Sequence, residues 1–279
     1  MRVITQPDDG LAPILKAIKR ARKTLDIVIF RFDLPELEDA LAAAVERGVA
    51  VQALIAHTNR GGEKQLRKLE SRLLKAGATL SRTADDMVRY HGKVMVVDRR
   101  TAFVLGFNFT AIDIKKSRSF GLATVNREIV AAVTKVIEAD HNRVAPILSS
   151  PRLVVSPENA RKRLETFIGK ARRELLIYDA NVCDDVMIAL LMKRASAGVK
   201  VKILGSLENK WHDPLLRVKA LRGMRLHVRA IVRDRKAAFV GSQSLRKLEL
   251  DKRREIGMIT KDPRAVGKIA AVFDTDWKA

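Results

Sequence analysis

The sequence predicts an α/β protein with a pseudo-two-fold duplication, in which each copy is a mostly parallel or mixed β-sheet flanked by helices. The first observation is an internal repeat, because residues 21–33 (ARKTLDIVIFRFD) align with residues 171–183 (ARRELLIYDANVC) at an offset of 150. Residues 47–55 (RGVAVQALI) align with residues 197–205 (AGVKVKILG) at the same offset. The second observation is that strand-like and helix-like segments alternate within each copy, as they do in α/β folds.

The predicted elements follow the same order in both copies. Each copy begins with a basic helix and a strand, continues with a helix that ends at a glycine and a second strand, and then has a further helix and a third strand. In the first copy, the helix over residues 36–46 ends before Gly48, a residue type that suits a left-handed C-cap. Branched residues predict the second strands, VAVQALIA (49–56) and VKVKIL (199–204).

A linker is predicted at residues 145–159, APILSSPRLVVSPEN, which contain three prolines and three serines. These residues interrupt both helical and strand periodicity. We therefore expect two domains, an N-terminal one over residues 1–150 and a C-terminal one over residues 151–279.

The third strand of each copy carries the same polar motif. YHGKVMVVD (90–98) and LHVRAIVRD (226–234) both read His, any residue, Lys or Arg, four residues, Asp. Side chains two apart on a strand share a face, so each histidine is expected to project together with its cation. The motif residues are His91, Lys93, Asp98, His227, Arg229 and Asp234.

Each motif is followed by a short apolar run and a turn, TAFVLGFNFT (101–110) and AAFVGSQSL (237–245). Asn108 and Ser244 both lie seventeen residues beyond their histidine. The offset between the motifs is 136, so the second copy is 14 residues shorter upstream of its histidine. A polar pattern repeated at this length predicts a shared functional site.

The groups in this pattern suit phosphoryl chemistry. A neutral imidazole can attack phosphorus while a protonated one releases the leaving alkoxide, and a pKa near 6.5 makes both states accessible. Lys93 and Arg229 are predicted to hold the nonbridging oxygens. Asn108 and Ser244 are expected to add hydrogen bonds to those oxygens or to the histidines. Asp98 and Asp234 are expected to cap turns rather than to act as bases.

Positive charge is the dominant feature of the composition, because 54 basic and 32 acidic residues give a net charge of +22. Residues 217–254, which contain His227, hold thirteen Lys or Arg and three acidic residues. Such a field attracts a polyanion, although anionic lipid attracts the same patch and a merely solvated basic face is the third possibility. Aromatic residues make up only 5%, so contacts to phosphate are favoured over base stacking.

Several classes of protein are disfavoured. No apolar run approaches the roughly 20 residues of a membrane span, and the N-terminal residues do not resemble a signal peptide. Cys183 is the single cysteine, which excludes an internal disulfide and a thiolate zinc cluster. We expect a cytoplasmic protein, with a peripheral membrane location as the alternative, and neither a metal nor another cofactor.

The doubled motif in a duplicated α/β chain resembles the phospholipase D superfamily over essentially the whole sequence. VERGVAVQALIAHTNRGGE (45–63) and RYHGKVMVVD (89–98) are similar to bacterial cardiolipin synthase-like members. The resemblance implies metal-independent phosphodiester cleavage through a phosphohistidine intermediate, with His91, Lys93, His227 and Arg229 as the catalytic residues. The superfamily contains phospholipases, phospholipid synthases and endonucleases.

This chain departs from the family pattern at several positions. The second copy keeps Gly241 and Ser242 but has Ser244 at the usual Asn position, whereas the first copy keeps Asn108 but replaces Gly-Ser with Leu105 and Gly106. Arg229 replaces the usual lysine. The family glutamate, in a pattern resembling RREIG, corresponds to Glu255, and we take its first-copy counterpart in SRSFG to be Phe120. If the carboxylate orients a histidine, one of the two histidines has that support.

Three functions compete on these grounds. A phosphodiesterase acting on nucleic acid is favoured by the charge. A phospholipase D or cardiolipin synthase-type phosphatidyltransferase acting on anionic phospholipid is favoured by the motif resemblance. A noncatalytic phosphate-binding module is favoured by the substitutions at Arg229 and Phe120. The nucleophilic histidine and the oligomeric state stay open.

Overall fold

The computed structural model describes residues 1–58, 63–208 and 213–279. The end of the predicted family-like segment 45–63 therefore lies partly outside the described residues. The N-terminal half contains β1 (Arg2–Gln6), α1 (Ala12–Arg20), β2 (Thr24–Ile29), α2 (Pro35–Glu46), β3 (Ala50–Ile55), α3 (Glu63–Lys75), β4 (Thr79–Arg82), β5 (Arg89–Tyr90), β6 (Val94–Val97), β7 (Thr101–Leu105), α4 (Ala111–Lys115), β8 (Ser117–Thr124) and α5 (Arg127–Asn142).

The C-terminal half repeats most of this order. It contains β9 (Leu153–Ser156), α6 (Ala160–Gly169), β10 (Glu174–Val182), α7 (Asp185–Ser196), β11 (Lys200–Leu207), β12 (Leu216–Lys219), β13 (Arg225–Leu226), β14 (Arg229–Arg233), β15 (Ala237–Gly241), α8 (Lys247–Asp251), β16 (Arg253–Thr260) and α9 (Pro263–Lys278).

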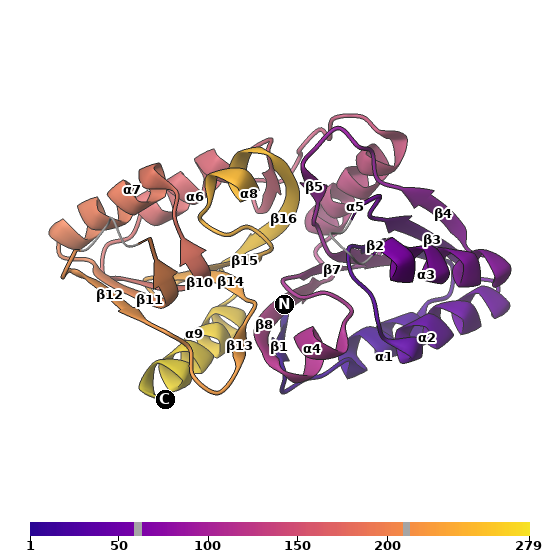
Figure 1. Ribbon diagram of the computed structural model, residues 1–279, viewed down its shortest axis with the longest axis horizontal. Coiled ribbons are helices and arrows are strands. Elements are labelled where there is room, and N and C mark those ends of the chain that lie inside the picture. Colours follow the sequence, from indigo (N-terminus) through magenta and orange to yellow (C-terminus); the bar gives the residue numbers. More distant parts are fainter. Residues whose placement is uncertain (59–62, 209–212) are drawn as a thin grey trace.

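The strands form two mixed sheets, which confirms the predicted fold class. One sheet has the order β1-β8-β7-β6-β2-β3-β4, and the other has the order β12-β11-β10-β14-β15-β16-β5. Within the first, β2, β3 and β4 are parallel, while β6, β7 and β8 join antiparallel. The two halves lie side by side (Figure 1).

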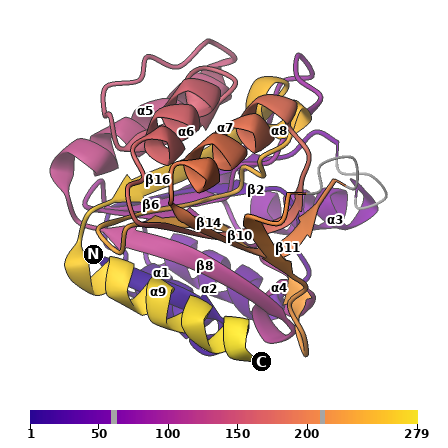
Figure 2. The ribbon, with the colours of Figure 1, turned by 90° about the vertical axis from the view of Figure 1, so that its left-hand side faces the viewer.

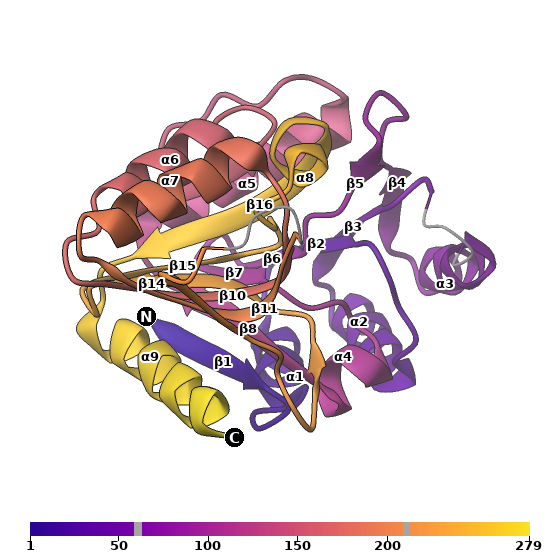
Figure 3. The same ribbon diagram turned by 60° about the vertical axis from the view of Figure 1, so that its left-hand side comes forward.

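Helices cover both faces of each sheet. Figure 2 shows α6 and α7 on one face of the C-terminal sheet and α9 on the other. One apolar cluster lies under the outer helices of each half. A third cluster is shared, because it joins Val133 of α5 and Phe273 of α9 with strand residues of both halves. The duplicated units are therefore fused through a common core. Figure 3 shows α5 beside α6 and α7 above the strands, and α9 below them.

Each half also lends one short strand to the sheet of the other half. β5 pairs in parallel with β16, and β13 pairs in parallel with β8. The exchange continues one residue further, because the His91 amide donates to the Arg254 carbonyl at 2.7 Å and the His227 amide donates to the Arg118 carbonyl at 3.2 Å. Both motif histidines are thus fixed to the sheet of the opposite half.

The exchange corrects the expectation that each motif is one continuous strand. Residues 91–93 are not in a strand, because the chain crosses there from the sheet that holds β5 to the sheet that holds β6. A second correction concerns the further helix after the second strand. The first half has α3, but the described residues 213–228 of the second half contain β12 and no helix, which accounts for the 14-residue difference in length.

The motif aspartates belong to tight hairpin turns. Asp98 and Arg99 have φ values of 52° and 51°, and Asp234 and Arg235 have 54° and 52°. Two consecutive residues at positive φ form the type I′ turn that suits the twist of a β-hairpin, and aspartate tolerates this conformation better than most residues. The short connections β6–β7 and β14–β15 follow directly from these turns.

Both aspartate side chains also bind backbone amides, in agreement with the predicted capping role. Asp98 accepts from the amides of residues 22–24 at 2.7 to 3.1 Å, and Asp234 accepts from those of residues 172–174 at the same distances. Burial opposes ionisation, but these backbone hydrogen bonds lower the pKa of both carboxyl groups. The motif aspartate therefore anchors the hairpin to the strand beside it.

Among the described residues, no helix is long and apolar enough to cross a membrane. The domain boundary at residue 150 stays a prediction.

Replacement of Asp98 by alanine should lower the free energy of unfolding by about 2 kcal/mol, because backbone amides lose a charged acceptor. Chemical denaturation measures this change. The lowered pKa means that the stabilisation is present above the ordinary aspartate pKa and is lost as the pH falls through the folded-state value. Asp39→Ala, at an exposed position, is the control. Equal stability of both variants would refute the anchoring role.

Candidate active site

Glu255 of the C-terminal half binds His91 of the N-terminal half. The His91 Nδ1 atom lies 2.8 Å from Oε2 and 3.1 Å from Oε1 of Glu255, whose side chain is fully buried. A carboxylate accepts, so Nδ1 carries the proton and the lone pair is at Nε2. The sequence left open which histidine Glu255 reaches, and the exchange of β5 onto β16 decides it.

Two further side chains fix the His91 ring. The Lys93 Nζ atom lies 2.9 Å from Nε2 and 3.0 Å from Nδ1 of the imidazole. The Phe30 ring meets it edge-on, with the ring centroids 4.4 Å apart and an interplanar angle of 81°. His91 and Lys93 do project together as predicted, although they are not on a regular strand.

Burial sets the charge of this cluster. It lowers the pKa of His91 well below the ordinary 6.5, and the positive charges of Lys93 and Arg229 lower it further. Burial also lowers the pKa of Lys93 to about 7, against the attraction of Glu255. Burial raises the pKa of the Glu255 carboxyl group, whereas the positive charge of Lys93 lowers it. His91 is therefore neutral near neutral pH, as a nucleophile must be.

The second motif is held differently. Arg229 donates from Nε to the Ser244 hydroxyl at 3.4 Å and from Nη1 to the His227 carbonyl at 3.3 Å. Ser244 in turn donates to the buried Asp179 at 2.6 Å. Asn108, the counterpart of Ser244, donates to Asp113 at 2.7 Å. The side chains of Asn108 and Ser244 thus donate to carboxylates rather than to the histidines.

His227 lacks a carboxylate at the position that Glu255 occupies beside His91. Its Nδ1 atom is buried without a hydrogen-bond partner, and the nearest carboxylate oxygen in an ion-pair arrangement is Oδ2 of Asp113, 3.4 Å away. Asp113 is held by Arg225 at 2.5 Å. Burial lowers the pKa of His227 well below 6.5, and Arg229, Lys93 and His91 add to this effect.

The register of the strands corrects the expected counterpart of Glu255. Gln6 of β1 lies opposite Ser119 of β8, and Ser156 of β9 lies opposite Glu255 of β16. Gln6 and Ser156 are repeat partners at the offset of 150, so Ser119 corresponds to Glu255. Phe120, which we took as the counterpart, instead packs edge-on against Tyr178 with the ring centroids 5.6 Å apart.

The change from Ser242 to Gly106 accompanies the loss of this carboxylate. Ser242 lowers the pKa of Glu255 through a side-chain hydrogen bond. At Gly106, an added Cβ would lie 2.9 Å from the Phe120 carbonyl oxygen and 3.1 Å from that of Gly241. A serine does not fit there without movement of the backbone. The C-terminal half therefore pairs the Ser242 hydroxyl with the Glu255 carboxylate, whereas the N-terminal half has Gly106 and Ser119 at these positions.

The two motifs act on one another at the interface between the halves. Arg229 influences the pKa of His91, and Lys93 and His91 influence that of His227. Each histidine is 7% exposed. The sequence interpretation missed the buried carboxylates Asp113, Asp179 and Glu249, as well as Phe30. Asp113 and Glu249 are separated by 136 residues, the same offset as the two motifs. This repeat is the sequence signal that could have identified these two carboxylates.

Among the described residues, no group of three or more His, Cys, Asp or Glu side chains is arranged to hold a metal ion.

A comparison with protein families gives a match over most of the chain. The sequence model of one family, described as "Cardiolipin synthase, PLD-like domain", matches residues 14–141 and again residues 164–277. A sequence comparison with curated proteins found no match.

Two solved structures share the fold over nearly the whole chain, and a third matches about half of it. Polyphosphate kinase from Porphyromonas gingivalis has a TM-score of 0.82 and 18% identity, over 99% of this chain and 50% of that one. The chain thus spans half the length of this enzyme. Phosphatidylserine synthase from Haemophilus influenzae has a TM-score of 0.69 and 10% identity, over 99% of this chain and 85% of that one. The phospholipase D family member Nuc from Salmonella typhimurium has a TM-score of 0.47 and 23% identity, over 53% of this chain and 97% of that one.

The pKa of about 7 for Lys93 predicts a pH-dependent anion site. Sulfate keeps its charge over this range, so its affinity should fall by up to about tenfold per pH unit above pH 7, as the ammonium group loses its proton. Titration calorimetry measures the affinity. Lys93→Arg should abolish the decline, because a guanidinium stays charged. Lys68→Arg, at an exposed position, is the control. If the sulfate affinity of Lys93→Arg still fell with rising pH as in the wild-type chain, a group other than Lys93 would be losing its proton.

Proposed function

The chain belongs to the phospholipase D superfamily, as a member of the cardiolipin synthase-like PLD-domain family, and from this premise we propose that it is a metal-independent phosphodiesterase acting on nucleic acid through a phosphohistidine intermediate. The observation that carries the proposal is the contact of His91 with Glu255 and Lys93, beside the charges of the second motif. The catalytic residues in the proposal are His91, Lys93, His227 and Arg229.

His91 is the nucleophile in this proposal. The Glu255 carboxylate holds the Nδ1 proton, leaves the Nε2 lone pair for phosphorus and stabilises the positive charge that the ring gains on phosphorylation. The phosphoryl group arrives beside Lys93, whose ammonium exchanges its contact with Nε2 for a nonbridging oxygen. Arg229 binds the same group from the other half.

His227 is the general acid and then the general base. As the Nε2–P bond forms and the P–O bond to the leaving group breaks, the His227 imidazolium donates its proton to the departing alkoxide. A water molecule then gives its proton to His227 and attacks phosphorus, and the P–N bond breaks to restore His91. Because the pKa of His227 is lowered, its protonated form must be stabilised before it can act as an acid. In this proposal the negative charges of the bound substrate and of the nearby Asp113 provide that stabilisation.

The net charge of +22 supports nucleic acid as the substrate, as does the basic segment 217–254 that contains His227. The second candidate function is phosphatidyl transfer on anionic phospholipid, in which an alcohol replaces water in the second step. The description of the matching family model favours this alternative. Both functions use the same phosphohistidine step.

Replacement of either histidine by alanine should reduce turnover at least about 10³-fold, because each removes a group that takes part in bond making or proton transfer. A covalent adduct at His91 should accumulate only in His227→Ala, with bis(p-nitrophenyl) phosphate as a substrate that needs no general acid. Glu255→Gln should slow turnover more than Asp98→Asn does. Mass spectrometry after an acid-free quench detects the adduct.

The substrate is tested with the wild-type chain in EDTA. Single-stranded DNA, duplex DNA, RNA and phosphatidylglycerol are incubated in parallel, and cleavage of nucleic acid alone is expected. Turnover of phosphatidylglycerol alone would favour the alternative of a phospholipase D or a phosphatidyltransferase. Wild-type rates in both histidine variants would rule out the phosphohistidine mechanism, whereas binding without turnover of any substrate by the wild-type chain would leave a noncatalytic phosphate-binding module.

A further inference from the structure

A second basic surface lies at the end of both sheets that is remote from the motif histidines. Ser119 of β8 contacts the His227 carbonyl through its hydroxyl at 3.4 Å and pairs with Gln6 of β1. At the other end of the same pair of strands, Arg2 lies opposite Ala123. Four residues of strand separate the two ends by roughly 13 Å. The far end is therefore outside the site formed by the two motifs.

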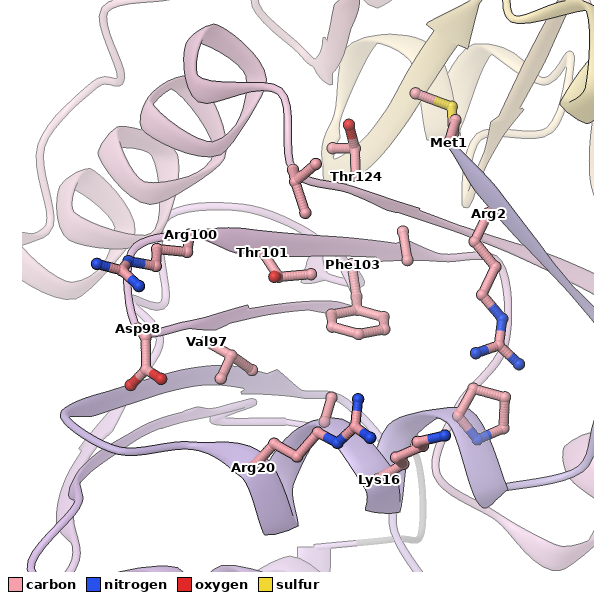
Figure 4. A pocket seen from close by; sticks show the side chains of 14 residues that line it. Met1, Arg2, Lys16, Arg20, Val97, Asp98, Arg100, Thr101, Phe103 and Thr124 are labelled. Atoms are coloured by element: carbon pink, nitrogen blue, oxygen red, sulfur yellow. The ribbon is translucent and has the colours of Figure 1, made fainter.

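The N-terminal half has a pocket of about 560 Å³ at this end. Lys16 and Arg20 of α1 and Arg2 of β1 lie around the buried Phe103, and Arg100 of the β6–β7 turn lines the edge of the pocket, with its side chain pointing away from Phe103 (Figure 4). Asp98 is the one acidic residue in the lining, and its carboxylate already accepts backbone hydrogen bonds. The pocket is thus lined by four basic side chains and the buried Phe103, and its one carboxylate already accepts hydrogen bonds from the backbone.

The C-terminal half repeats this pocket with a volume of about 760 Å³. Arg152 and Lys170 occupy the positions of Arg2 and Arg20 at the offset of 150. Its lining also contains Arg163, Arg233 and Lys261, and one acid, Asp262, which is paired with the N-terminal ammonium group. Met1 and Thr124 line both pockets. The two pockets are therefore adjacent and form one basic surface across both halves, which we call the rear basic surface.

Within the part of the chain that the structure describes, six cations of the rear basic surface form no ion pair, whereas cations nearby do. Arg99 pairs with Glu138 at 2.7 Å, but its neighbour Arg100 forms no ion pair. Among the described residues, the same holds for five further cations of this surface, namely Lys16, Arg20, Arg152, Lys170 and Lys261. Like charges left together without partners raise the local potential and repel one another, which an anionic ligand relieves.

We propose that the rear basic surface binds the phosphate backbone of a nucleic acid strand across both halves, away from the residues that carry out the chemistry. This inference rests on the proposed function, because it gives the nucleic acid substrate a second contact. The cations line two adjacent pockets, so they can contact several phosphates of one strand. Phe103 and Phe167 are each 4% exposed, so bases do not stack on them and binding is independent of sequence.

A membrane fits this surface less well. The sites are recessed, and among the large apolar side chains in their lining Val125 alone is strongly exposed, at 73%. Peripheral membrane proteins combine basic residues with several apolar side chains that enter the lipid.

Three charge-reversal variants test the proposal. The first combines Lys16→Glu, Arg20→Glu and Arg100→Glu, and the second combines Arg152→Glu, Lys170→Glu and Lys261→Glu. The matched control combines Lys68→Glu, Lys75→Glu and Lys193→Glu, which are also exposed and change the net charge equally. Fluorescence anisotropy of a labelled DNA strand, in a His91→Ala background, gives affinity at several salt concentrations. Circular dichroism verifies the fold.

Each rear variant should weaken DNA binding at least about tenfold, and the slope of log affinity against log salt should become shallower by about 2 to 3, because three phosphate contacts are lost. The control variant should retain affinity within about threefold. With His91 restored, hydrolysis of bis(p-nitrophenyl) phosphate should be unchanged in all three, because this small substrate does not reach the rear basic surface.

Equal loss of affinity in the control and rear variants would overturn the proposal, because net charge alone would then explain binding. Wild-type affinity in the rear variants would overturn it too. Loss of binding to phosphatidylglycerol vesicles without loss of DNA binding would assign the surface to a membrane. Failure of the proposed function is separate, since it would appear as absent hydrolysis in the wild-type chain whatever the DNA affinity.

Discussion

The exchange of two short strands is the constraint on which the rest of the structure depends. β5 and β13 each pair with the sheet of the opposite half, and the histidine that follows is fixed by a backbone hydrogen bond to that sheet. The next residues return to their own sheet. Each motif therefore spans the interface between the halves, and the side chains beside a histidine come from both copies. Neither copy contains a complete set of contacts for its own imidazole.

Burial gives these contacts their chemical effect. Lys93 and Glu255 lie out of water with His91 between them, so the protonation state of the imidazole depends on fixed neighbours rather than on solvent. His227 is equally buried but has an unpaired Nδ1 atom and a more distant carboxylate. Two residues with the same place in the repeat thus differ in environment, and this difference suits the separate tasks of a nucleophile and a proton donor.

The sequence was sufficient for the fold class and the duplication, because repeats and strand periodicity can be read directly from the residues. The capping role of Asp98 also followed from residue type. The contact of Glu255 with His91 was not predictable, since it depends on a strand exchange of two residues that carries no periodic signal. The pairing of Glu255 with Phe120 was wrong by one residue, because the motif offset of 136 already gives Ser119 as the counterpart, and the register with Gln6 and Ser156 agrees. The described residues 213–228 contain no counterpart of α3, and a length difference of 14 residues was the only sign of this in the sequence.

The N-terminal copy has Gly106 and Ser119 at the positions that Ser242 and Glu255 occupy in the C-terminal copy, so the two copies cannot replace one another. In a dimer of identical subunits, every subunit must supply both an imidazole and the carboxylate that serves its partner. Here the carboxylate survives in one copy only, and the backbone at Gly106 has closed over the space that a serine needs. A dimer of two N-terminal copies would have no such carboxylate, and a dimer of two C-terminal copies would have no Lys93. The two copies are therefore not interchangeable, because each lacks a part that only the other supplies.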